Sequence, residues 1–139
     1  MCSNWGIDPW LHLRGLKHVR LSWVDMPDGA RGRTNGVDVI WLNKGQQQVE
    51  RRCALAHELV HLEREHRGCQ PLSIEADVCE ETARRLIPMD LLSKGLRWAR
   101  SFDELADELW VTPDVLRDRL TGLADAEWET LLTLELQPL

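Results

Sequence analysis

The sequence predicts an α+β fold, in which a small antiparallel sheet precedes two long helices and a C-terminal helical cluster. Three observations in the 139-residue chain predict it. Turn dipeptides and alternating apolar residues fill the region before residue 43, which is typical of strands. Residues 46–67 contain neither Gly nor Pro, which favours one long helix. Short helical patterns follow residue 101. A chain of this length forms one domain, or one domain with a helical appendage.

The first third of the chain is expected to form a short helix and then the three strands of the sheet. Asp8-Pro9 is typical of a helix start, and the helix is predicted over residues 10–16. Apolar residues alternate with polar ones over residues 19–23, and Asn35-Gly36 is a strong signal for a hairpin turn. The sequence therefore predicts strands over residues 19–23, 31–34 and 37–42.

Two long helices are expected after the sheet. The first lies within residues 46–67 and ends at the break from Gly68 to Pro71. The second covers residues 74–87, with Ser73 as its N-cap and Pro88 as its end. Three shorter helices are predicted over residues 103–109, 113–120 and 126–134.

Charge and composition narrow the class of protein. The net charge is −6, and residues 101–139 hold ten acidic residues against two arginines, which gives that segment −8. Residues 102–120 have the rhythm of a helix-turn-helix, but so acidic a segment is not expected to bind nucleic acid directly. The chain has no apolar run of membrane-spanning length and no export signal at its N-terminus. We therefore expect a cytoplasmic protein with reduced cysteines and no membrane partner.

The stretch RRCALAHELVHLEREH, residues 51–66, carries the pattern HELVH. His57 and His61 are four residues apart, so on a helix they lie on one face and can both reach one metal ion. Glu58 is rotated by about 100° from His57, near enough to act as a base toward a water on that ion. A catalytic zinc has three protein ligands and an open fourth position. The pattern therefore predicts a zinc site that needs one more ligand.

Periodicity favours Glu75 as this third ligand. Glu75 lies near the start of the second long helix, which can fold back against the first helix after the break. It lies on the less charged face of that helix, whereas Asp77 lies about 200° around it on a charged stripe. We therefore predict a His-His-Glu site. The other candidates are Glu63, Glu65, His66 and Cys69.

RRCALAHELVHLE, followed by EADVCEETARRLIP, resembles the ImmA/IrrE family of zinc metallopeptidases, in particular its short actinobacterial and actinophage members. Members pair an HExxH helix with a second helix that begins with a ligand Glu and ends in a Leu-Ile/Met-Pro stop. Here that stop, Pro88, comes 13 residues after Glu75. The upstream stretches DPWLHL and VIWLN also resemble these members, so the similarity covers nearly the whole chain.

The resemblance implies a zincin-like metallopeptidase core over residues 1–100, and a helix-turn-helix-like segment over residues 101–139 that packs on the core. It implies that His57, His61 and Glu75 bind Zn2+ and that Glu58 is the general base. The expected activity is cleavage of a specific regulatory protein inside the cell, in phage, mobile-element or stress regulation. The expected protein substrate is a helix-turn-helix transcriptional repressor.

Two departures from this pattern keep an alternative function open. Cys79 stands where thermolysin-like enzymes place an acid that orients a ligand histidine. The chain also has no tyrosine to stabilise an oxyanion, and the candidates left for that role are Arg31, Arg33, His66 and Arg84. The alternative is a zinc-binding protein–protein regulator that does not hydrolyse, such as an anti-repressor or a toxin–antitoxin component.

An extended substrate is expected to lie along a sheet edge beside the metal, held by main-chain hydrogen bonds. Residues 30–34 are the candidate edge. We predict Arg31, Gly32 and Arg33 as substrate-binding residues, because a glycine between them permits close approach of another backbone. The same residues also fit an ordinary hairpin arm.

Overall fold

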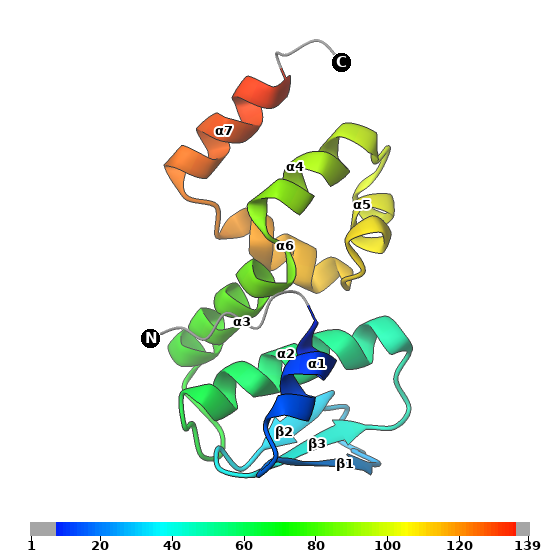
Figure 1. The fold of residues 1–139 in the computed structure, drawn as a ribbon, viewed down its shortest axis with the longest axis vertical. Coiled ribbons are helices and arrows are strands. Elements are labelled where there is room, and N and C mark those ends of the chain that lie inside the picture. The colour runs from blue at the N-terminus through cyan, green and yellow to red at the C-terminus, as the bar shows by residue number, and fades with distance from the viewer. Residues whose placement is uncertain (1–7, 136–139) are drawn as a thin grey trace.

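Seven helices and three strands make up the described part of the computed structural model, residues 8–135. Along the chain they are α1 (Pro9–Gly15), β1 (Arg20–Val24), β2 (Gly32–Thr34), β3 (Val39–Asn43), α2 (Gln48–Glu63), α3 (Leu72–Leu86), α4 (Met89–Trp98), α5 (Phe102–Leu109), α6 (Pro113–Thr121) and α7 (Asp125–Glu135). The sheet lies with α1 and α2 at one end of the molecule, and α4, α5 and α7 lie at the other (Figure 1). The predicted α+β class is confirmed.

The sheet is mixed, so the prediction of an antiparallel sheet is wrong. Its strand order is β1-β3-β2, with β1 parallel to β3 and β2 antiparallel to β3. The predicted turn does join β2 to β3: Gly36 has φ +75°, and Asn35 Oδ1 accepts hydrogen bonds from the N–H groups of residues 37–39. The apolar strand β3 buries Ile40 and Leu42 completely, which suits a central position between two neighbours. Strands β1 and β2 follow each other in the chain but are not neighbours in the sheet, because β3 lies between them. The short, polar β2 is therefore an edge strand.

Helix α2 packs its apolar face on the sheet. Leu55, Leu59 and Val60 are buried there in one cluster with Ile40 and Leu42 of β3. Each large apolar side chain buried in this way contributes about 1.5–3 kcal/mol. At the start of α2 the Glu50 carboxylate accepts the Gln47 N–H at 3.1 Å, which satisfies one otherwise free donor. The helix that carries the HELVH pattern is therefore held rigidly against the sheet.

Helix α3 begins one residue before the position predicted to cap it. Pro71 is the N-cap, and Ser73 lies inside the first turn, so the prediction of Ser73 as N-cap is wrong. Pro71 has φ −57°, and a proline of this conformation leads directly into a helix without a side-chain cap. The helix ends at Leu86, just before Pro88, because proline disfavours helical backbone at the residue before it.

The C-terminal helices contact the end of α3 through α6. Helix α6 packs on α3, and the buried Arg119 of α6 donates from Nε to the Ile87 carbonyl at 2.8 Å. Helix α4, whose Leu92 is fully buried, is absent from the helices that the sequence predicts. No helix within residues 8–135 is long and apolar enough to cross a membrane.

Candidate metal centre

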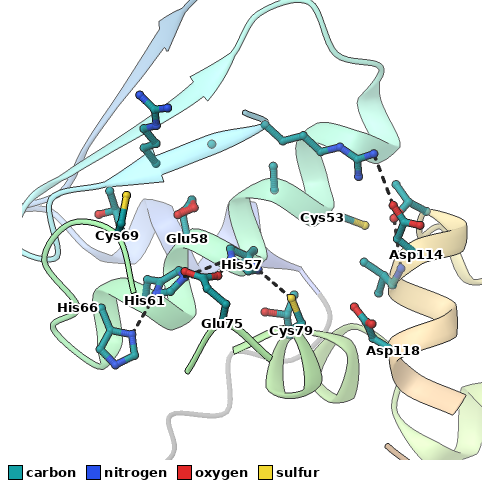
Figure 2. A pocket seen from close by; sticks show the side chains of 18 of the residues that line it. Cys53, His57, Glu58, His61, His66, Cys69, Glu75, Cys79, Asp114 and Asp118 are labelled. Atoms are coloured by element: carbon teal, nitrogen blue, oxygen red, sulfur yellow. Dashed lines mark hydrogen bonds and ion pairs between the residues drawn. The ribbon is translucent and has the colours of Figure 1, made fainter. Parts of the chain in front are cut away.

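Three side chains from two helices converge at one point. His57 and His61 project from α2 and Glu75 from α3 (Figure 2). The His57 and His61 Nε2 atoms are 3.2 Å apart. His57 Nε2 lies 3.2 Å from Glu75 Oε2, and His61 Nε2 lies 3.0 Å from Glu75 Oε1. The structure thus brings together the three ligands predicted from the sequence.

These three donors fit a metal ion. A tetrahedral zinc with bonds of about 2.0–2.1 Å separates neighbouring donor atoms by roughly 3.3–3.4 Å, close to the separations of these side chains. Burial lowers the pKa of both His57 and His61, so both imidazoles are held neutral. A neutral imidazole is the form that binds a metal. Of the described residues, only these three form a group that could hold an ion.

Glu58 lies beside this group but is not part of it. Its side chain is buried, with 6% of the residue exposed, and lines the same pocket. Burial, and then the charge of Glu75, raises the pKa of Glu58 to about 8, which the charge of Arg33 partly opposes. A cation held by the three ligands would lower that pKa again. Glu58 is therefore placed to exchange a proton with a molecule in the pocket.

The pocket has a volume of about 700 Å³ and is built from four elements. Strand β2 and the residue before it form one wall, so Arg31, Gly32 and Arg33 all line the pocket. A Cβ added to Gly32 would lie 3.1 Å from Glu58 Cγ, so the strand lies directly against the candidate base. The predicted substrate-binding residues are thus in the pocket, and their binding role stays a prediction.

Helix α6 forms a wall of the same pocket, which sequence reasoning missed. This wall consists of the N-cap residue Thr112 and of Asp114, Val115 and Asp118 of the helix. Arg31 Nη2 of the opposite wall lies 3.7 Å from Asp114 Oδ2 (Figure 2). Nothing in the local sequence signals this contact, because it depends on how α6 packs on α3.

The other candidate ligands lie outside the metal group. Glu63 pairs with Arg85, and Asp77 is exposed. Cys69 is an exposed residue at the pocket wall, and Glu65 is exposed with φ +58°. His66 contacts the ligand His61 rather than joining the ligands.

Cys79 lies next to His57, on the side of the imidazole ring that faces away from Glu75. Its Sγ lies 4.0 Å from His57 Nδ1. Burial, and then the charges of Asp118 and Glu75, raises the pKa of Cys79 to about 11, so the group is a neutral thiol. Cys53, Cys69 and Cys79 are free of disulfides, and Cys2 lies outside the described residues.

Comparisons of the chain with family models, with curated proteins and with solved structures found no match. The resemblance to ImmA/IrrE metallopeptidases therefore stays a prediction from the sequence motifs. What the chain does is inferred from its own side chains and from that resemblance.

Proposed function

We propose that this chain is a zinc-dependent metallopeptidase of the ImmA/IrrE type, which cleaves a specific regulatory protein. The observation that carries the proposal is the convergence of His57, His61 and Glu75, with the buried Glu58 beside them in one pocket. Two neutral imidazoles and one carboxylate are a ligand set that catalytic zinc uses. A carboxylate next to such a set, but outside it, is placed as the general base.

His57, His61 and Glu75 would hold the ion, and a bound zinc supplies Lewis-acid chemistry and lowers the pKa of a water molecule. Glu58 accepts the proton of the attacking water and delivers it to the amine of the departing peptide. This order of events needs Glu58 ionised at the start, and a cation held by the three ligands would favour that form. Burial of Glu58 keeps competing solvent away from the proton.

The peptide is proposed to pair with β2. This strand bonds to β3 on one side, and within the described chain no other strand covers its second side. An extended peptide can therefore add to it by main-chain hydrogen bonds. Gly32 presents no side chain toward Glu58, so this strand can lie directly against the candidate base.

Oxyanion stabilisation falls to the residues that remain near the pocket. Arg84 is tied to Glu127 and to the Gly122 carbonyl, so it is a structural residue. Arg31, Arg33 and His66 line the pocket, and the charge of Arg33 acts on Glu58. We therefore assign this role to the pocket-lining group as a whole, in which Arg33 is paired with Asp28 and Arg31 with Asp114.

The proposed substrate is a helix-turn-helix transcriptional repressor, as the resemblance implies. The acidic segment from residue 101 onward, with its charge of −8, supports a basic protein partner through complementary charge. The same charge opposes direct binding of this chain to nucleic acid.

A second candidate function is a zinc-binding protein–protein regulator without hydrolysis. Two observations favour it: the chain has no tyrosine, and a neutral thiol rather than a carboxylate faces His57. In this case the metal group stabilises the junction between α2 and α3, and the pocket holds a partner segment without cutting it.

The two functions are separated by Glu58→Gln. Cells of the native host express either the wild type or the variant, and their proteomes are compared for fragments made only by the wild type. Zinc content is measured in both proteins, and His61→Ala serves as the control that loses the metal. The peptidase predicts a fragment pair from one repressor-like protein with the wild type alone. Equal zinc with no difference in fragments, and with biological activity kept in Glu58→Gln, would instead support the regulator.

A further inference from the structure

The ligand His61 is held from both sides of its ring. Its Nε2 faces Glu75 at 3.0 Å, and its Nδ1 lies 3.0 Å from Nδ1 of His66. The two imidazoles meet edge to face, with an interplanar angle of 63° and ring centroids 5.2 Å apart. His61 is only 5% exposed, whereas His66 is half-buried at the pocket wall. His66 thus contacts the ring nitrogen that a metal on Nε2 would leave free (Figure 2).

The backbone presents His66 to His61 at an energetic cost. Glu65, the residue before it, has φ +58° without being glycine, a strained conformation that is concentrated at functional sites. The His66 N–H donates to the His61 carbonyl at 3.0 Å. On the other side the turn before β3 presses on this loop, since a Cβ added to Gly36 would lie 2.4 Å from the His66 carbonyl oxygen. The strained turn therefore has a fixed position.

We propose that His66 is a positioning residue of the metal centre, which accepts a hydrogen bond from the metal ligand His61. With the ion on Nε2, His61 keeps its proton on Nδ1 and donates it to Nδ1 of His66, whose own proton is on Nε2. Such a partner fixes the tautomer and orientation of the ligand ring and makes the ligand more basic. The inference rests on the proposed metal site, because it concerns how that site is held.

The other ligand histidine has a much weaker partner. His57 Nδ1 faces Cys79 Sγ at 4.0 Å, and a neutral thiol is a poor acceptor. The contact of His66 with His61 is therefore stronger than that of Cys79 with His57, although both contacts are made to the Nδ1 atom of a ligand. This difference supplies an internal comparison, because loss of the His66 acceptor should weaken metal binding far more than loss of the Cys79 sulfur.

The test measures zinc affinity by competition with a chromophoric chelator, for the wild type and three variants of the full chain. His66→Phe keeps a flat ring but removes the acceptor, and His66→Asn offers Oδ1 at about the place of the imidazole Nδ1. Cys79→Ala is the matched control at the other ligand. We expect His66→Phe to bind zinc about 10–100-fold more weakly. His66→Asn should recover most of that loss, and Cys79→Ala should change the affinity by less than about threefold.

A second readout is the proton on His61 Nδ1 in the zinc-loaded, ¹⁵N-labelled protein. It should give a slowly exchanging imidazole resonance in the wild type and in His66→Asn, and should be lost to exchange in His66→Phe. If His66→Phe fails to fold, the wild-type resonance and the affinity of His66→Asn still decide. Equal affinities for all variants, or an Asn variant as weak as the Phe variant, would overturn the proposal.

A wild type that binds no zinc would overturn the metal centre and this inference together. Neither readout uses a substrate, so a failure to find proteolysis bears on the proposed function alone.

Discussion

Glu127 joins three parts of the C-terminal half through one carboxylate. Its Oε2 accepts from Arg119 Nη2 of α6 at 3.0 Å, and its Oε1 accepts from Arg84 Nη1 of α3 at 3.2 Å and from the Ala124 N–H at 3.0 Å. Arg119 is 3% exposed, so its charge depends on this partner. Because α6 carries Asp114 to the pocket wall, the strength of this contact bears on the shape of the candidate site.

Replacement of Glu127 by Gln tests how much the negative charge of Glu127 contributes to the free energy of unfolding. The hydrogen bond from Arg119, and then that from Ala124, lowers the pKa of Glu127 from 4.5 to about 2. A shift of this size corresponds to at most about 3.4 kcal/mol. The side chain is 20% exposed, and solvent screening reduces the contribution to about 1–2 kcal/mol. Gln has a single acceptor oxygen, so it keeps the hydrogen bonds on one side only and turns its NH2 toward a donor on the other. The loss expected at pH 7 is therefore at least this electrostatic part.

The direction of the pKa shift determines how the stability contributed by Glu127 changes with pH. A carboxylate whose pKa is depressed in the folded state contributes its stability above the unfolded pKa and loses it as the pH falls through the folded value. The difference between wild type and Glu127→Gln should therefore be complete above about pH 5 and should disappear toward pH 2. Urea denaturation at a series of pH values, followed by circular dichroism, measures it. A difference in free energy of unfolding that is equal at pH 7 and pH 3 would refute the electrostatic reasoning.

Three further predictions concern the site. Zinc at about 100 times its dissociation constant should stabilise the wild type by about 2.7 kcal/mol, and a chelator should reverse this; thermal denaturation should show no such shift for His61→Ala. Gly36→Ala should destabilise the fold by at least about 1 kcal/mol, because φ is +75° and the new Cβ meets the His66 carbonyl oxygen; its zinc affinity should also fall, and unchanged affinity would contradict the role of that turn. Gly32→Val should displace Glu58, whose Cγ lies 3.1 Å from the new Cβ, and should lower fragment yield while zinc content stays the same.

Local rules account for what the sequence by itself determined. Residues four apart on a helix share a face whatever surrounds the helix, so the spacing of His57 and His61 was sufficient to pair them. The turn at Asn35-Gly36 and the end of α3 before Pro88 follow from the conformations that Gly and Pro allow. The choice of Glu75 also needed only periodicity and the break between two helices. Apart from the choice of Glu75, these predictions concern short stretches of chain, where backbone sterics dominate.

Tertiary packing decided the rest. The pairing of β1 with β3 depends on which strand takes the central place in the sheet, and β3, whose Ile40 and Leu42 are fully buried, takes it. The α6 wall of the pocket depends on the packing of α6 against α3. The contacts of His66 and Cys79 with the ligand histidines depend on a strained turn and on the approach of α3 to α2. Each of these contacts is set by the summed burial of many side chains, which no short stretch of sequence records.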